Sequence, residues 1–382
     1  MSPAGARPGT RAVLLLARAG YIGRALAVRA DAARSTGGGI RRGAPADDAA
    51  REAQLAANHS RAYLEIWEQA AVALGADLRE LGDGFIAIER DGVRTVTWRH
   101  LVMLDHPATV RLALDKLLVH RMLLAEGIPV PDHIEVGPGQ TDQALAFAAA
   151  ADGACVIKPA AGTSGGSGVT CGVRTTDDLL RSWLQASQWD ARILVERAVE
   201  GREFRLLFLD GKLVDAVERR RPRLTGNGRS SVRELIRSEN DRRLSAATGD
   251  VSRFLSVDLD CEIAVRESGS SLGSTPPEGQ IVVVKGTVGQ NAAADNSTAP
   301  ELSPELIREA ARAVELLQLT LAGVDLVTPD PSVSLASAGG AVLEVNATPG
   351  LHYHYQLADR TRATPVAVTV LRRLLEGAPG LR

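Results

Sequence analysis

The feature that most constrains the fold of this chain is a set of four separated segments that each join a short apolar run to charged residues or glycines. In chain order they are VIKPAAGTSGGSGV (156–169), ILVERAVEGREFRLL (193–207), GVD (323–325) and VLEVNATPG (342–350). Short apolar runs between stretches with helical periodicity are typical of strands in a sheet that helices cover. We therefore predict an α/β (α+β) fold.

Length and composition set mild limits on the class of protein. The chain has 382 residues, of which 45% are hydrophobic and 24% charged, and its formal net charge is −2. A single core rarely grows beyond about 250–300 residues, so two or three packed domains are expected. The near-neutral charge and the 3% aromatic content argue against a nucleic-acid partner. No run reaches the roughly 18 apolar residues of a membrane span, so no membrane partner is expected.

The three cysteines predict reduced packing residues. Cys155, Cys171 and Cys261 lack the Cys-x-x-Cys and Cys/His spacings of metal ligands. Cys155 and Cys171 lie in apolar or glycine-rich surroundings that suit small buried side chains. The apolar run at 12–16 is too short, and too quickly followed by charge, for a signal peptide. These observations predict a cytoplasmic protein.

The beginning of the chain predicts a separate N-terminal α/β region, 1–106. Residues 11–18 (RAVLLLAR) favour a buried strand that leads into residues 20–30, and residues 37–50 favour a mobile connector. The GYIGR stretch at 20–24 lacks the further glycines of a dinucleotide fingerprint. We therefore expect no nucleotide site in this region.

Other segments have clear boundaries. Periodicity predicts helices over 50–82, 108–126 and 141–151, strands at 85–88 and 94–98 joined by the Asp91-Gly92 turn, and a strand at 155–158. Ser303, Pro304 and Glu305 predict a helix start, because Ser can cap, Pro suits the first position and Glu complements the positive end of the dipole. The buried stripe of that helix is expected to comprise Leu306, Ala310, Val314 and Leu317.

The first of the four segments predicts a site for the phosphates of ATP. Such a site needs fixed cations and main-chain N–H groups that can approach closely. Lys158 ends an apolar strand, and Gly162, Gly165, Gly166 and Gly168 follow in one loop. The lysine precedes the glycines, so this is not a Walker A loop. The alternative is a flexible surface loop.

The second segment places two acids near strand ends. Residues 193–195 predict a buried strand, and Glu196 is expected where the chain leaves the sheet. Glu203 follows seven residues later beside a strand at 204–209, which turns at 210–211 into a strand at 212–217. The alternative to a role in binding is that both acids are simply solvated.

The last two segments predict a metal site. In residues 341–346 a strand period of two places Val342, Glu344 and Asn346 on one face. Asp325 can lie beside them if residues 329–340 connect an antiparallel pair. Carboxylate and amide oxygens are ligands that Mg²⁺ prefers, with Mn²⁺ as the alternative ion. An unpaired acid inside apolar strands would be costly to bury, which favours a functional Asp325.

Further motifs resemble those of one enzyme family. They are Glu203-Phe204-Arg205, Arg221-Pro222, Gly226-Asn227-Gly228, Leu321 to Asp325, and Gly340 to His352. The stretch from about 105 to 375 resembles the ATP-grasp carboxylate–amine ligases, in particular the ATP-grasp part of cyanophycin synthetase and of bifunctional glutathione synthetases. The resemblance implies an ATP-grasp domain at 107–375, with a nucleotide-binding subdomain to about 200, a catalytic subdomain from about 201, and a tail at 376–382.

The resemblance also implies an activity and residue roles. The expected reaction is phosphorylation of a carboxylate by ATP and magnesium, followed by attack of an amine on the acyl phosphate. Glu196 would lie beside the adenine, Glu203 would bind the ribose hydroxyls, and Lys116 would reach the phosphates. Arg205 is the candidate for holding the transferred phosphate, because a guanidinium can bind phosphoryl oxygens with two N–H groups. The expected substrates are an amino acid or short peptide and an amine.

Three departures from the family limit this expectation. The Mur-ligase-like half of cyanophycin synthetase is missing from the sequence, so polymerisation of two amino acids is not expected. The usual Gly-Asp-Gly is Gly226-Asn227-Gly228, and the usual Asn-x-Ser-x-Gly-Gly is replaced within residues 286–297. We therefore expect acceptor recognition to differ.

Several alternatives stay open at this stage. The basic cluster from Arg219 to Arg223 is either a solvated turn or part of the substrate site, with Arg221 the candidate that faces it. His352 and His354 either act on the substrate or are ordinary surface residues. The whole chain is either a ligase, a kinase-like or carboxylase relative, or a non-catalytic ATP-binding protein. A homodimer is compatible with the sequence.

Overall fold

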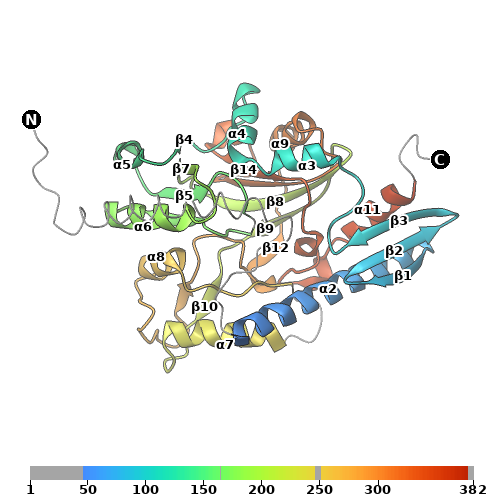
Figure 1. Ribbon diagram of the computed structural model, residues 1–382, viewed down its shortest axis with the longest axis horizontal. Coiled ribbons are helices and arrows are strands. Elements are labelled where there is room, and N and C mark those ends of the chain that lie inside the picture. Colours follow the sequence, from blue (N-terminus) through green and yellow to red (C-terminus); the bar gives the residue numbers. More distant parts are fainter. Residues whose placement is uncertain (1–45, 164, 246–250, 377–382) are drawn as a thin grey trace, which may run out of the picture.

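The computed structural model describes residues 46–163, 165–245 and 251–376. Four antiparallel sheets and the helices around them make up this part of the chain (Figure 1). The mixture confirms the predicted fold class. The strand expected at 11–18, the segment at 20–30 and residues 37–45 of the expected connector lie outside the described residues.

The central element is a five-stranded sheet in the order β12-β9-β8-β13-β14. Its strands are β8 (Arg202–Leu209), β9 (Lys212–Arg219), β12 (Asn296–Thr298), β13 (Leu321–Thr328) and β14 (Ala341–Asn346). One face packs on the helices α3 (Pro107–Ala113), α4 (Lys116–Ala125) and α9 (Pro304–Leu316), which lie on the same side of the sheet in Figure 1. Phe204, Leu206 and Phe208 of β8 point into this core. Because strand side chains alternate, Glu203, Arg205 and their neighbours face the other way.

A second sheet has four strands in the order β4-β7-β5-β6. They are β4 (His133–Val136), β5 (Cys155–Pro159), β6 (Thr170–Val173) and β7 (Ile193–Arg197). The helices α5 (Thr141–Ala150), α6 (Thr176–Ala186) and α8 (Leu259–Glu267) share one core with the face that carries Ile157 and Val195. Lys158 and Glu196 alternate with these residues and therefore lie on the face away from that core.

A third, smaller unit surrounds a two-stranded sheet. β10 (Arg223–Thr225) pairs with β11 (Ile281–Val283), and α7 (Val232–Ser245) and α8 pack beside them. Val232, Ile236, Cys261 and Val282 belong to its core. This unit brings the segments 251–256 and 285–291 close to the second sheet.

The N-terminal elements pack against the C-terminal ones. α2 (Ala46–Leu74) and the sheet of β1 (Asp77–Gly82), β2 (Phe85–Arg90) and β3 (Val93–Trp98) share a core with α11 (Val366–Leu375) and with Leu207 and Leu209 of β8. Hydrophobic packing therefore crosses the expected boundary at 106/107. The domain limits themselves stay predictions.

Several sequence predictions about local structure are confirmed. The β2–β3 hairpin turns at Asp91 and Gly92, which have φ angles of 53° and 77°. Ser303 accepts a hydrogen bond from the Leu306 backbone and caps α9. The four residues of its predicted stripe are buried. All three cysteines are free, and Cys155 and Cys261 are buried, whereas Cys171 is partly exposed.

Other boundaries were wrong. The helix expected over 50–82 begins at Ala46 and ends at Leu74, so residues 46–50 are helical and residues 77–82 form β1. The helix expected over 108–126 is two helices, because the Asp115 side chain accepts a hydrogen bond from the Leu118 backbone and starts a new helix after Leu114. Periodicity continues across such a break and cannot reveal it.

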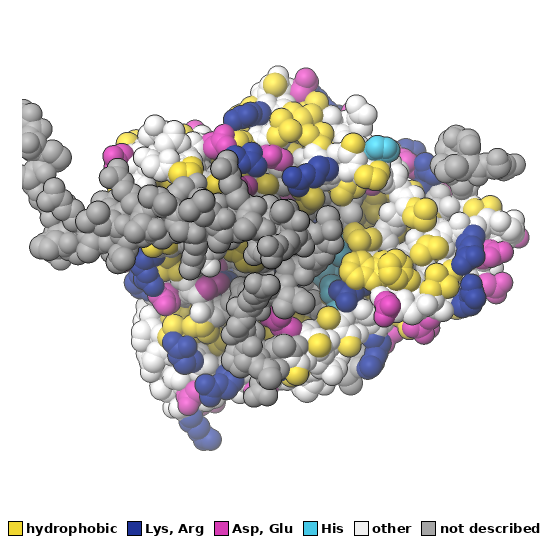
Figure 2. Space-filling model, viewed as in Figure 1, with side chains coloured by type: hydrophobic (Ala, Val, Ile, Leu, Met, Phe, Trp, Pro, Cys, Tyr) yellow, Lys and Arg dark blue, Asp and Glu magenta, His cyan; other side chains and the backbone are white. Residues whose placement is uncertain are grey.

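The described surface is mixed in character. Figure 2 shows basic and acidic side chains interspersed over the visible face, with apolar side chains gathered toward its right-hand part. Over residues 46–163, 165–245 and 251–376, the helices are too short or too polar to cross a membrane.

Four short elements complete this description. The 3₁₀ turn η2 (Leu351–His354) follows β14, and η3 (Arg360–Arg362) precedes α11. η1 (Ala293–Asp295) and α10 (Leu335–Ala338) lie in the connections before β12 and β14.

Candidate active site

The charged face of the five-stranded sheet gathers residues from three predicted segments. Residues directly opposite on antiparallel strands share a face. Asp325 on β13 is opposite Arg205 on β8 and Glu344 on β14, and Gly323 is opposite Asn346. The strand register therefore places the proposed phosphate-binding arginine beside the proposed metal ligands.

The expected metal trio is together, and each acid is paired with a cation. Arg205 Nη2 donates to Asp325 Oδ2 at 2.6 Å, and Arg205 Nε contacts Asp325 Oδ1. Asn346 Nδ2 donates to Asp325 Oδ2 at 3.2 Å. Lys116 Nζ lies 3.1 Å from Glu344 Oε1. Burial would raise the pKa of Asp325, but the charge of Arg205 outweighs it and holds the pKa below its ordinary value.

One detail of the prediction was wrong. β14 has a bulge opposite the step from Asp325 to Leu326, so Leu343 has no partner in the register. Val342 was expected on the face of Glu344 and Asn346. The extra residue instead turns Val342 into the hydrophobic core with Val345.

The trio fits a hard divalent cation by its donor chemistry, since two carboxylates and one amide side chain lie on adjacent strands and an amide oxygen can bind such an ion. Within the described ranges, no group of three or more His, Cys, Asp or Glu side chains has metal-site geometry. Asp325 and Glu344 supply two such side chains, and the third predicted donor is the Asn346 amide.

Lys158 and Glu196 form a buried pair on the second sheet. Lys158 Nζ lies 2.7 Å from Glu196 Oε1, and both side chains are less than a tenth exposed. Glu196 was expected where the chain leaves the sheet, which is wrong. β7 continues through Arg197, so Glu196 is paired with His133 on one side and Val156 on the other. A short apolar run does not reveal that a strand continues through charged residues.

Helix α4 connects the two sheets. Lys116 and His120 are four residues apart and therefore share a face of the helix. Lys116 pairs with Glu344 of β14, whereas His120 Nδ1 lies 3.7 Å from Glu196 Oε1 of β7. His120 Nε2 also lies 3.2 Å from the Leu343 carbonyl oxygen. Burial, and then the charge of Lys158, lower the pKa of His120 to about 3, so its imidazole is neutral.

The glycine loop has a conformation that side chains rarely adopt. Gly162, Gly165, Gly166 and Gly168 have φ angles between 62° and 81°. A Cβ atom at Gly168 would lie 2.6 Å from Trp189 Cδ1, and one at Gly166 would lie 2.9 Å from Thr287 Oγ1. The glycines are therefore required by backbone angle and by close packing. Their contact with phosphates stays a prediction.

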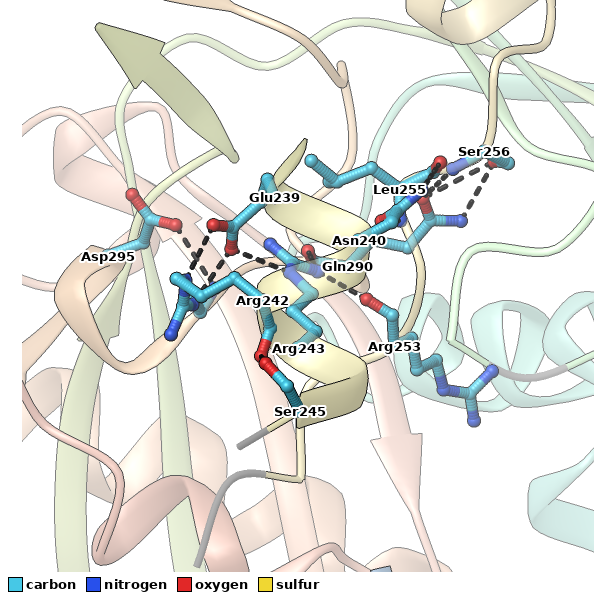
Figure 3. A network of polar contacts seen from close by, with 11 residues as sticks. Glu239, Asn240, Arg242, Arg243, Ser245, Arg253, Leu255, Ser256, Gln290 and Asp295 are labelled. Carbon is cyan, nitrogen blue, oxygen red and sulfur yellow. Dashed lines mark hydrogen bonds and ion pairs between the residues drawn. The ribbon is translucent and has the colours of Figure 1, made fainter. Parts of the chain in front are cut away.

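A polar network supports the segments that pack on this loop (Figure 3). Arg243 of α7 is buried, and its Nη1 donates to the Gln290 carbonyl at 2.8 Å and to the Arg253 carbonyl. Its Nε donates to Glu239 Oε1 at 2.8 Å. The Arg253 guanidinium lies against Gly165. One buried arginine thus holds both segments that cover the glycine loop.

Glu203 has an unusual environment. It is opposite Arg219 on β9 and Val327 on β13. Burial raises its pKa to about 7, although the charges of Arg219 and Arg221 act in the opposite direction. Its expected contact with a ribose stays a prediction.

The sequence reasoning favoured Arg221 within the basic cluster, did not single out Arg219, and missed Tyr353. Arg219 is buried, and its Nη1 lies 3.8 Å from Asp325 Oδ1. The Tyr353 ring lies 4.1 Å from the Arg219 guanidinium and 5.2 Å from that of Arg205. Arg221, which was expected to face the site, is exposed, and its charge reaches Glu203. Strand alternation from Glu203 and Arg205 into the next strand was the signal that could have identified Arg219.

The remaining candidates lie in defined contacts. His352 and His354 are buried, so the surface alternative was wrong. His352 Nδ1 is 2.8 Å from Tyr63 Oη, and His354 Nδ1 is 2.6 Å from Asp215 Oδ2. The Asn227 side chain accepts hydrogen bonds from the backbones of Arg229 and Ser230 and so builds a turn. Roles of these residues in catalysis stay predictions.

Comparison with known proteins supports the same interpretation. The chain matches no family model. It is 34% identical over 250 residues to cyanophycin synthetase of Trichormus variabilis, a match that covers 64% of the chain and 27% of that protein. It is 26% identical over 299 residues to the glutathione biosynthesis bifunctional protein of Listeria innocua, covering 76% of the chain and 38% of that protein. The chain thus matches well under half the length of these curated relatives.

A solved structure shares the fold. The bifunctional glutathione synthetase from Pasteurella multocida superimposes with a TM-score of 0.51 at 19% identity, over 83% of this chain and 43% of that chain.

Proposed function

Because this chain belongs to the ATP-grasp family, we propose that it is an ATP-dependent carboxylate–amine ligase that forms an amide bond through an acyl phosphate. The observation that carries the proposal is the bridge made by α4. Lys116 pairs with Glu344 of the metal trio on one sheet, and His120 lies beside Glu196 of the buried Lys158–Glu196 pair on the other. Charged residues from two sheets thus contact one helix, α4, through Lys116 and His120.

Nucleotide binding in this proposal uses residues of both sheets. Lys158 and Lys116 offset phosphate charge, and the four loop glycines let main-chain N–H groups approach the phosphates. By family resemblance, Glu196 lies beside the adenine and Glu203 binds the ribose. Asp325, Glu344 and Asn346 would hold Mg²⁺ or Mn²⁺, which when bound neutralises charge on the phosphate oxygens.

The reaction needs no protein nucleophile. The substrate carboxylate attacks the γ-phosphorus of ATP, so a carboxyl oxygen–phosphorus bond forms and ADP leaves. The amine then attacks the acyl carbon, phosphate leaves with the bonding electrons, and the amine loses a proton. Arg205 and Arg219, buried on the charged face, are placed to offset the negative charge that moves between these oxygens.

The substrate class follows the relatives only in outline. We propose an amino acid or short peptide as carboxylate and a second small molecule as amine. A non-catalytic ATP-binding protein is the alternative, and the presence of every proposed phosphate and metal residue argues against it.

Phosphate release from ATP and Mg²⁺ across a panel of amino acids and dipeptides tests the proposal. Products are identified by mass, and the expected product mass is the sum of the two substrates minus water. Glu344→Gln should lose at least about a hundredfold in turnover because it removes a charged ligand. Glu301→Gln is the matched control, since Glu301 is exposed. ATP binding without turnover for any pair in the panel would favour the binding protein.

A further inference from the structure

A cluster of aromatic and basic side chains lies between the N-terminal region and the charged face. His59 and Tyr63 of α2, His100 after β3, and His352 of η2 have ring centroids within 5.3–6.4 Å of one another in five pairs. Tyr63 Oη and His352 Nδ1 are hydrogen-bonded at 2.8 Å. Three separate parts of the chain thus supply one imidazole cluster. The proposed reaction gives no role to His59 and His100, its N-terminal members.

The cluster is continuous with the proposed active site. The ring of His352 lies 4.0 Å from that of Tyr353. Tyr353 in turn stacks on Arg219 and Arg205, and Arg205 holds Asp325. A group bound at the imidazoles would therefore lie next to residues that contact the charged face.

Two imidazole nitrogens in the cluster are unsatisfied. His59 Nε2 and His100 Nδ1 are shielded from solvent and have no hydrogen-bond partner in the described part of the chain. A buried polar atom without a partner costs about 1–3 kcal/mol, so such atoms commonly mark a missing ligand or water. In the appropriate tautomer each nitrogen can donate a hydrogen bond.

Arg99 supplies positive charge to the cluster and has a strained backbone angle. It precedes His100 in the chain, and its guanidinium donates a hydrogen bond to Ser60, the neighbour of His59. It lies in the tight turn between Trp98 and Leu101 with a φ of 53°. An arginine there costs about 1–2 kcal/mol relative to glycine. Trp67 donates a hydrogen bond to the Arg99 carbonyl at 2.7 Å, which fixes the turn on α2.

The Arg99 guanidinium has N–H groups that are not used in the two hydrogen bonds to the protein. Its Nε donates to Ser60 Oγ at 3.0 Å and its Nη2 to the Ala56 carbonyl at 3.4 Å. A guanidinium has five N–H groups, so at least three remain for a ligand. Across residues 46–163, 165–245 and 251–376, no carboxylate lies within ion-pair distance of Arg99.

The electrostatics of the cluster agree with this geometry. Burial, and then the charge of Arg99, lower the pKa of His59 to about 3 and that of His100 to about 4. The charge of Arg253 acts in the same direction on the pKa of both histidines. A group of cations and neutral imidazoles that has no acid among the causes of these shifts favours an anion.

We propose that Arg99, His59 and His100 form a subsite for a carboxylate group of the substrate, distinct from the carboxylate that is activated. A planar carboxylate matches the fork of one guanidinium, and its negative charge matches Arg99, which has no carboxylate partner among the described residues. The subsite rests on the proposed function and adds to it. It gives the N-terminal region a role in recognising an amino acid or peptide by its free carboxylate.

The subsite can be tested without turnover. Long-range ¹H–¹⁵N NMR of the purified protein resolves its seven histidines, and single His→Gln variants assign them. The probe is N-acetylglycine, and N-acetylglycinamide is its uncharged control. Saturable shifts of the His59 and His100 nitrogens with the acid alone are expected. Equal shifts with the amide, or no saturable shift, would overturn the proposal. Inorganic phosphate that binds more tightly than the carboxylate would overturn its ligand class.

Variants show whether Arg99 holds the probe. Arg99→Gly and Arg99→Asn suit the left-handed backbone, so at least one should fold. Each is expected to weaken probe binding about tenfold to a hundredfold, as for loss of a charged hydrogen bond. Arg94→Gln, an exposed residue of the same hairpin, is the control and should bind normally. Probe binding unchanged in both Arg99 variants would contradict the assignment.

An activity arm separates this inference from the ligase proposal. For any panel substrate that is turned over, the matched analogue carries a carboxamide in place of the recognised carboxylate and keeps the activated carboxylate. Its KM should be raised by about tenfold to a hundredfold, with kcat nearly unchanged. If no substrate is turned over but the NMR shifts are carboxylate-specific, the ligase proposal fails and the subsite stands. Turnover with equal KM for acid and amide overturns the subsite alone.

Discussion

Replacing Asp325 by Asn is expected to destabilise the fold in addition to removing a proposed metal ligand. Asp325 contacts Arg205 through both carboxylate oxygens and lies 3.8 Å from Arg219 Nη1. Both arginines are buried on the charged face of the central sheet. Asn has nearly the same size, so both guanidiniums stay in place and lose the charge between them.

The magnitude follows from burial. Removing one partner of a buried ion pair costs about 3–5 kcal/mol. The Asp325 side chain is 17% exposed, and Asn can still accept one hydrogen bond. We therefore expect a loss near the lower end, about 3 kcal/mol in the free energy of unfolding. Glu344→Gln should cost less, about 1–2 kcal/mol, because Glu344 is 31% exposed, although its partner Lys116 is only 9% exposed.

Urea unfolding followed by tryptophan fluorescence measures both changes. The difference in free energy is the shift in midpoint multiplied by the m-value. Asp152→Asn, at an exposed position, is the control. The double variant Arg205→Gln/Asp325→Asn should recover part of the loss, because it removes one uncompensated buried charge. A midpoint for Asp325→Asn equal to that of the control would refute the reasoning.

Three further predictions concern the glycine loop, Glu203 and Asn227. Gly168→Ala should destabilise the protein by about 2 kcal/mol more than Gly139→Ala, and it should weaken ATP binding measured by calorimetry. Both glycines have positive φ, but only Gly168 of the two lacks space for a Cβ atom. Equal effects of the two substitutions would contradict this. Glu203 has a folded pKa of about 7 against an ordinary 4.5, so its burial costs stability as pH rises through that window. The free energy of unfolding of Glu203→Gln should therefore exceed that of the wild type by on the order of 2 kcal/mol at pH 8 and equal it near pH 4. A difference that stays constant between these pH values would contradict the prediction. Asn227→Asp should retain the turn and leave urea unfolding and turnover within about twofold, since either side chain accepts the same two backbone hydrogen bonds; a large loss of activity would indicate direct contact of Asn227 with substrate.

Local sequence determined much of the secondary structure of this protein. A turn that needs positive φ, as at Asp91-Gly92, and a cap such as Ser303 act over a few residues, so their patterns are legible without a fold. The order of the four segments, together with family resemblance, also indicated the ATP-grasp fold. The same reasoning failed at the Asp115 cap and at β1, where periodicity carried across a break between elements.

The grouping of the site was only partly legible. Period two correctly placed Glu344 and Asn346 on one face, since alternation is a property of the strand itself. It could not reveal the bulge that turned Val342 inward, the continuation of β7 through Glu196, or the burial of Arg219. Each depends on which strand lies alongside and in which register.

Sequence by itself thus determined the elements, the fold class and the chemical types of residue available to a site. Tertiary structure alone decided that Lys116 and His120 of one helix join two sheets. It also decided that His59, His100 and His352, separated by up to 293 positions (352 − 59), meet in one cluster beside Arg99. The physical reason is that local propensity acts over one or two turns of chain, whereas burial, ion pairing and strand register act between segments that only folding brings together.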